Sequence, residues 1–171
     1  MILKPIPEVD QPIIDRWDQD ERLSYYIKTD PPNKDLPCMS WGIYIGDNEL
    51  IGWSNLFNID KENLRAEFGI GIPDQKHIRL GVFASRWTVA YGFRELYLHR
   101  IYVRPLASNV LPYPLDIRDR GGFVREGVER QAVCRGKIYE DVIVMGILRD
   151  EFEKRWGDVS CQQQFQQSAQ R

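Results

Sequence analysis

A short run of basic residues lies where a predicted strand passes into a predicted helix. Lys76, His77 and Arg79 form the basic part of this run, and Gly81 closes it. Backbone N–H groups at the start of a helix lack partners within it, and the helix dipole adds positive potential, so such a junction can hold a phosphate. A glycine there lets the backbone approach a ligand closely. The run predicts a pyrophosphate site, and a basic strand-to-helix connection with a glycine is the alternative.

Hydrophobic periodicity predicts the elements that position this run. Residues 66–72 alternate small and apolar side chains, which predicts a strand, and a Pro-Asp pair ends it. From Gly81 the apolar residues recur at three- and four-residue steps, which predicts an amphipathic helix to about Leu96. Residues 98–103 are apolar and β-branched and predict a second strand.

The rest of the chain predicts further strands and helices around one sheet. They are a strand at 1–5, a helix from Pro12 to about Asp20, a short helix at 21–26, strands at 40–45 and 50–57, a polar turn at 58–63, a strand pair at 123–130 and 137–148, and a helix at 149–156. This order predicts an α+β fold with one domain over 1–156. The remaining 157–171 is a polar, Gln-rich tail that we expect to be disordered.

Composition excludes several classes of protein. The chain has 171 residues, of which 43% are hydrophobic, and a net charge of −2. That charge gives no electrostatic case for binding nucleic acid or a membrane surface. Three cysteines without a CxxC spacing and only two histidines argue against a metal site, and the odd cysteine count fits a reducing compartment. The N-terminal segment carries prolines and acids in place of a signal peptide, so we expect a cytoplasmic protein.

Two stretches resemble one known family. AYGFRELYLHRIYVR (90–104) and GGFVREGVERQAVCRGKIYEDVIVMGILRDEF (121–152) are similar to the GNAT superfamily of N-acetyltransferases, in its RimJ/RimL-like branch, and the resemblance covers roughly residues 2–155. It implies a single-domain GNAT-like fold with a mixed, mostly antiparallel sheet and helices on both faces. It further implies acetyl-CoA as co-substrate, acetyl transfer to a primary amine of a protein N-terminus or a small molecule, and a homodimer.

The resemblance also implies where the cofactor would bind. Backbone groups of the two strands, at Phe68–Ile72 and Tyr102–Arg104, would hold the thioester and the pantetheine arm. The basic run with the first helical residues would hold the pyrophosphate. Asn109 matches a family residue near the cofactor arm, with a turn or cap residue as the alternative. The candidate cofactor-binding residues are Phe68, Gly69, Ile70, Lys76, His77, Ile78, Arg79, Leu80, Gly81, Val82 and Asn109.

Glu67 and Tyr113 are the candidate catalytic residues. The family often has Glu at the position of Glu67, where it would act as general base directly or through water. The alternative is a strand-end carboxylate paired with Arg65 or Arg100. The family's general-acid Tyr corresponds to Arg118 here, and the nearby Tyr113 is the candidate replacement.

Arg79 stands where the family has its middle loop glycine. Its side chain would either crowd the pyrophosphate or pair with it through the guanidinium. Together with Arg118 this departure supports a second hypothesis. In that hypothesis the chain is a catalytically inactive GNAT-like binding or regulatory protein.

Overall fold

The computed structural model describes residues 1–20, 33–109 and 122–157. Within them the chain forms strands, three α-helices and two short 3-10 turns. In chain order these are β1 (Ile2–Lys4), η1 (Glu8–Asp10), α1 (Gln11–Gln19), β2 (Met39–Ile45), β3 (Glu49–Asp60), β4 (Arg65–Gly71), η2 (Gln75–His77), α3 (Ile78–Arg94), β5 (Arg100–Val103), β6 (Val124–Arg135), β7 (Ile138–Leu148) and α5 (Arg149–Trp156). The predicted helix at 21–26 and residues 158–171 of the predicted tail lie outside the described residues.

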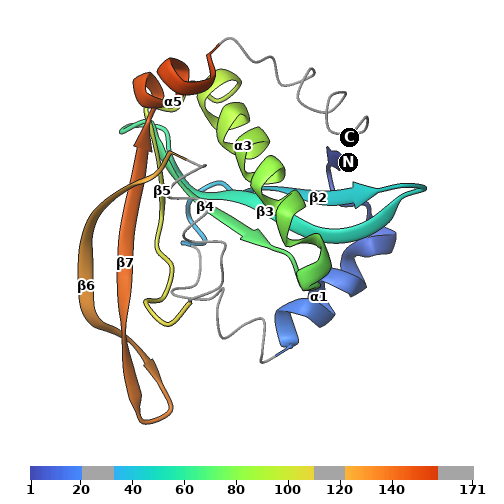
Figure 1. Cartoon of the computed structure of the whole chain (residues 1–171), viewed down its shortest axis with the longest axis horizontal. Helices are drawn as coiled ribbons and strands as arrows, with labels where there is room; N and C mark the ends of the chain where they lie inside the picture. Colours follow the sequence, from blue (N-terminus) through green and yellow to red (C-terminus); the bar gives the residue numbers. More distant parts are fainter. Residues whose placement is uncertain (21–32, 110–121, 158–171) are drawn as a thin grey trace.

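The strands form one mixed sheet in the order β1-β2-β3-β4-β5-β7-β6. Every neighbouring pair is antiparallel except β4 and β5, which run parallel. A parallel pair needs a crossover, which η2 and α3 supply here. This topology confirms the predicted mixed, mostly antiparallel sheet of an α+β fold. Figure 1 shows α3 crossing the sheet and the β6–β7 hairpin reaching beyond the other strands.

Helix α3 packs tightly on one face of the sheet. A Cβ on Gly92 would lie 2.7 Å from Ile101 Cδ1 and 3.0 Å from Leu56 Cδ1, so the helix and strands touch where a side chain is missing. Ser54 of β3 and Thr88 of α3 are completely buried, and their hydroxyl oxygens lie 2.8 Å apart. Apolar packing and one buried hydroxyl pair therefore fix α3 against the sheet.

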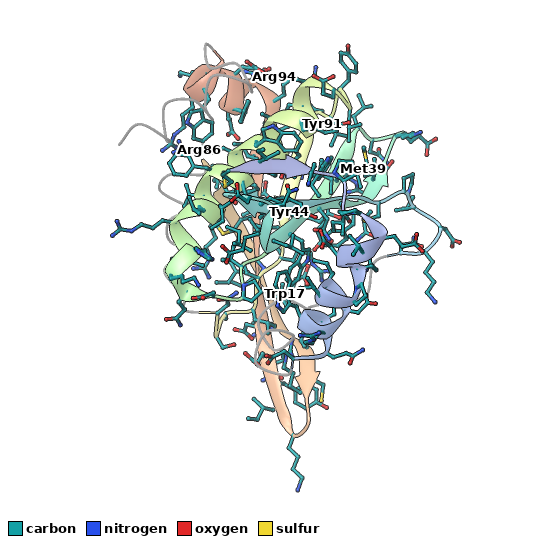
Figure 2. The ribbon with its side chains drawn as sticks, turned by 90° about the vertical axis from the view of Figure 1, so that its right-hand side faces the viewer. Trp17, Met39, Tyr44, Arg86, Tyr91 and Arg94 are labelled. Carbon is teal, nitrogen blue, oxygen red and sulfur yellow. The ribbon has the colours of Figure 1, made fainter. Side chains whose placement is uncertain are left out.

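Helix α1 lies on the opposite face. Trp17 of α1 stacks on Trp53 of β3 with ring centroids 5.6 Å apart. Figure 2 labels Trp17 on this helix. Trp53 and Ser54 are neighbours on β3, so their side chains point to opposite faces, and Ser54 meets α3. Helices therefore cover both faces, as the resemblance implied.

The structure corrects the predicted start of α3. The helix begins at Ile78, three residues before Gly81. Asp74 Oδ1 accepts a hydrogen bond from Lys76 N–H, and Asp74 O accepts one from His77 N–H, so η2 leads directly into the helix. Arg79 therefore lies in the first helical turn and not in a loop.

The predicted polar turn at 58–63 is also displaced. Strand β3 continues to Asp60, and the turn follows at residues 61–64. Asn58 adopts a left-handed backbone conformation with φ 52°, and the register shifts between Phe57 and Asp60. This bulge uses extra residues on β3 and lets Asp60 pair with Arg65.

Candidate functional site

The parallel strands β4 and β5 separate after a short paired stretch. Among the described residues, their last pair in register is Glu67 with Tyr102. β4 nevertheless continues to Gly71, while β5 ends at Val103. The predicted cofactor residues Phe68–Ile70 lie in this continuation of β4. Backbone groups on its β5 side face the opening between the strands, where an extended ligand can pair with them.

The N-terminus of α3 follows the end of β4 closely (Figure 1). Ile78 N–H donates to Gln75 O. The first turn of an α-helix leaves its N–H groups without acceptors inside the helix, and here this applies to Arg79 and Leu80. Together with the helix dipole, these groups favour an anion at this end of α3. Gly81 and the other predicted residues of this region thus belong to one helix terminus.

A carboxylate also lies at this helix terminus. Lys76 Nζ is 3.0 Å from Asp74 Oδ2. The hydrogen bond from Lys76 N–H and then the Lys76 side chain lower the pKa of Asp74, and Asp74 in turn raises the pKa of Lys76. An arriving phosphate must therefore compete with Asp74 for Lys76.

Two other predicted residues at this terminus differ in exposure. Arg79 is exposed. The Nδ1 atom of His77 is buried and has no hydrogen-bond partner in the described part of the chain. His77 is the residue that precedes the first helical position, so its side chain belongs to the helix terminus as well.

Glu67 is a buried carboxylate at the beginning of the opening, with 5% of its surface exposed. Asn58 Nδ2 donates a hydrogen bond to Glu67 Oε2 at 3.1 Å. Asn58 Oδ1 in turn accepts a hydrogen bond from Asn33 N–H at 2.8 Å. Asn58 is thus held from one side while it orients the carboxylate on the other. A donated hydrogen bond favours the charged form of a carboxylate, which is the form that accepts a proton.

The two arginines weighed as partners of Glu67 have other carboxylates beside them. Arg65 Nε is 3.1 Å from Asp60 Oδ2. Arg100 forms a two-point ion pair with Glu126, with both N–O distances at 2.5 Å. These contacts give each arginine a carboxylate of its own on the sheet surface.

Tyr102 lies beside Glu67 in the parallel register. Burial raises the pKa of Tyr102, and the nearby charge of Glu67 raises it further. The guanidinium carbon of Arg100 lies 5.7 Å from the centre of the Tyr102 ring. Where β4 and β5 separate, the neutral phenol of Tyr102 therefore lies beside Glu67.

Asn109 follows β5 in a segment that is attached to β7. Leu106 forms an isolated bridge with Val142, and Asn109 N–H donates to Leu106 O at 3.1 Å. Asn109 therefore ends a turn, which is the alternative role weighed for it, and its place near the cofactor arm stays a prediction. Tyr113 and Arg118 lie outside the described residues, as does the predicted general-acid position.

Sequence reasoning missed the contribution of Asn58. The sequence assigns Asn58 to a polar turn, whereas the structure places it on a strand bulge beside Glu67. A left-handed residue within a strand leaves no periodic signal. Sequence reasoning named the backbone of Tyr102 but not its side chain, which a parallel pairing of the two predicted strands would have brought beside Glu67.

Two classes of site receive no support from the described residues. No group of three or more His, Cys, Asp or Glu side chains there could hold a metal ion. Within the same residues, no helix has the length and apolar character needed to cross a membrane.

Comparison with known proteins finds related sequences. The chain is 32% identical over 117 residues to the probable N-acetyltransferase YjcK of Bacillus subtilis (strain 168), and the match covers 67% of this chain and 64% of the relative. It is 28% identical over 109 residues to the putative ribosomal N-acetyltransferase YdaF of the same organism, with coverage of 63% and 58%. The chain thus spans less than two thirds of the length of both relatives. No protein-family model matches the sequence.

Solved structures share the fold over most of the chain. A spermidine N-acetyltransferase from Vibrio cholerae, solved in complex with CoA and spermine, has a TM-score of 0.73 and 21% identity, covering 88% of this chain and 96% of that one. A mutant of the Vibrio cholerae enzyme has a TM-score of 0.76 and 22% identity, with coverage of 90% and 96%. At these identities the similarity establishes the fold, which is the α+β fold expected from the sequence.

Proposed function

We propose that this chain is a member of the GNAT superfamily and transfers an acetyl group from acetyl-CoA to a primary amine. The observation that carries the proposal is the arrangement along β4. Buried Glu67 marks the point where β4 and β5 separate, and β4 then leads to the N-terminus of α3. A carboxylate base, a strand with open backbone groups and an anion-binding helix end therefore follow one another along β4.

We assign acetyl-CoA binding to the two ends of this arrangement. The end of η2 and the N-terminus of α3, from Lys76 to Val82, receive the pyrophosphate, and Arg79 reaches it from the exposed side of the first helical turn. Backbone groups of Phe68–Ile70 align the thioester arm. A backbone N–H there polarises the thioester carbonyl, as acyl transfer requires. Asn109 approaches the arm from the β7 side.

Glu67 serves as the general base. Its carboxylate takes a proton from the acceptor ammonium, and the amine nitrogen then attacks the thioester carbonyl carbon. The new C–N bond forms as the C–S bond breaks, and the nitrogen, which is again positively charged after the attack, loses its second proton to solvent. CoA leaves as a thiolate that takes up a proton. Tyr113 is the proposed donor of that proton.

The acceptor is a protein N-terminus or a small amine. Spermidine and spermine belong among the candidates, because the structurally similar Vibrio cholerae spermidine N-acetyltransferase was solved with spermine.

A GNAT-like binding protein without turnover is the second candidate function. The observation that favours it is the Asp74 carboxylate, which holds both Lys76 N–H and Lys76 Nζ at the helix terminus. A carboxylate at that place opposes a pyrophosphate by like-charge repulsion. This candidate predicts that the protein binds acetyl-CoA weakly or not at all.

Titration calorimetry with acetyl-CoA and with CoA, followed by a thiol-release assay with a panel of amines, separates the two functions. We expect micromolar binding and amine-dependent thiol release. Glu67→Gln should lower kcat about a hundredfold or more while leaving acetyl-CoA affinity unchanged, because general bases typically contribute 10²–10⁴-fold. Glu8→Gln, at an exposed position in η1, is the matched control. Weak binding or none at millimolar cofactor would favour the binding protein over the enzyme. Micromolar binding without any thiol release across the panel would contradict acetyl transfer while leaving the cofactor site in place.

A further inference from the structure

A buried hydrogen-bond acceptor lies close to the separation of β4 and β5. The Oδ1 atom of Asn55, on β3, is buried and has no hydrogen-bond partner among the described residues. A buried carbonyl left without a donor destabilises the folded state, and such groups are rare in native proteins. The position therefore requires a donor from water, from a ligand or from another part of the chain.

Strand register places this carbonyl over the candidate site. Asn55 lies opposite Gly69, and Phe57 lies opposite Glu67, so all four positions share the face that α1 covers. A Cβ on Gly69 would collide with Asn55 Oδ1 and would lie 3.2 Å from Phe57 Cε1. The Asn55 side-chain carbonyl thus lies over Gly69. Gly69 is the next residue after Glu67 on this face of β4, at the beginning of the opening.

We propose that Asn55 binds the nitrogen of the acceptor amine, an inference that rests on the proposed acetyl transfer. A primary aliphatic ammonium donates one N–H to Glu67 and a second to Asn55 Oδ1, with the Phe57 ring against its charge. Asn55 and Glu67 are diagonal neighbours across an antiparallel strand pair, and the Cα atoms of such residues lie about 7–8 Å apart. One nitrogen between their side chains can reach both oxygens.

The two acceptors then have different tasks in the reaction. Glu67 removes one proton from the ammonium. The amine N–H that is bound to Asn55 Oδ1 stays in place. The lone pair that deprotonation creates on the amine nitrogen is therefore held in one orientation. The amide oxygen cannot act as a base, which makes the division of tasks a consequence of residue type. The ligand class that fits is a primary ammonium with at least two N–H donors, and a quaternary ammonium of the same charge does not fit.

A matched pair of ligands tests this assignment without requiring turnover. Butylammonium and butyltrimethylammonium carry the same charge, but only the first has N–H donors. NMR titration of the full chain should show butylammonium binding at least about tenfold more tightly than its trimethyl analogue. Asn55→Leu should abolish most of that preference, and Asn55→Asp, which keeps an acceptor oxygen, should retain it. Gly69→Ala provides a second variant, because its Cβ displaces the Asn55 carbonyl without removing the amide.

Steady-state kinetics then distinguish the two proposals from each other. Asn55→Leu should raise KM and lower kcat for every amine in the panel, because the contact is to the reacting nitrogen. Its acetyl-CoA affinity should stay within about twofold of wild type.

If wild type releases no thiol but shows an Asn55-dependent preference for butylammonium, the proposed acetyl transfer fails and the amine site stands. If wild type is active and Asn55→Leu changes neither the ligand preference nor KM, water or another segment satisfies the carbonyl and the assignment is wrong. A wild type that binds neither ligand also overturns it.

Discussion

Asn58 fixes the orientation of the proposed base. Its side chain donates to Glu67 Oε2 and accepts from Asn33 N–H, so one residue joins β3, β4 and the chain before β2. The backbone conformation of Asn58 makes this arrangement testable. The left-handed backbone, at φ 52°, is one that glycine adopts without strain, so the side chain can be removed without disturbing the bulge.

Asn58→Gly should lower kcat/KM at neutral pH about tenfold and should move the acid limb of the pH–activity profile to higher pH. The reason is that the Glu67 carboxylate loses a hydrogen bond that favours its charged form. Initial rates of thiol release between pH 5 and 9 measure the shift. Acetyl-CoA affinity should not change, because the Asn58 side chain bonds to Glu67 and Asn33, neither of which is a proposed cofactor residue.

Asn48→Gly is the control for this change. Asn48 also has a left-handed backbone, at φ 78°, and its side chain accepts a hydrogen bond from Lys4 Nζ, but it lies in the β2–β3 turn. We expect it to leave the profile unchanged. A profile that Asn58→Gly does not move either would mean that the hydrogen bond to Glu67 has no influence on the base.

Only part of the residue-level arrangement was predictable from the sequence. Glu67 was identified through the family resemblance and lies at the separation of the strands, although its role is a proposal. Asn58 and Asn55 were not identified. Each acts through an exact strand register, and the bulge that sets the register near Asn58 depends on one backbone angle that hydrophobic periodicity does not record.

Among the elements, α3 connects the proposed cofactor site to the core. Thr88 Oγ1 donates to Ala84 O at 3.0 Å, so its single hydrogen is used within the helix. Ser54 Oγ, at 2.8 Å, must then be the donor to Thr88 Oγ1. This buried bond is a direct polar link between α3 and β3, on the face of β3 opposite to Trp53.

Thr88→Val should destabilise the protein by about 1–3 kcal/mol, because the completely buried Ser54 hydroxyl loses its acceptor. Ser54→Ala should cost less, about 0.5–1.5 kcal/mol, because Thr88 keeps its bond to Ala84. The double variant should be more stable than the sum of the two changes predicts, since it leaves no unpaired hydroxyl. Urea unfolding followed by circular dichroism measures all three. Additive changes would show that the two hydroxyls do not interact.

Element boundaries show what periodicity predicts well. Helix 149–156 was predicted with the bounds that the structure has, and both long strands of the β6–β7 pair were found. The start of α3 was missed because the carboxylate and carbonyl of Asp74 create a 3-10 turn before the helix. Capping by one side chain is a local interaction, and the apolar pattern from Gly81 onward does not contain it.

For the molecule as a whole, several carboxylates are stabilised in their charged form. Hydrogen bonds from Asn63, with a smaller contribution from Arg65, lower the pKa of Asp60 to about 2. Lys76 lowers the pKa of Asp74, and Arg100 lowers that of Glu126. These groups lie at the end of β3, before α3 and on β6, so their protonation affects separate parts of the fold.

Stability should therefore fall as the pH drops from about 4, where unfolded carboxylates begin to bind protons, to about 2, the folded pKa of Asp60. The sign follows from the lowered pKa values, because the unfolded chain binds more protons than the folded one across this window. Thermal unfolding by circular dichroism at pH 2–7 measures the loss. Asp60→Asn should lower the melting temperature at pH 7 and flatten its decline below pH 4, whereas Asp47→Asn, in the exposed β2–β3 turn, should do neither. A decline as steep in Asp60→Asn as in wild type would show that acid acts on the fold through other groups.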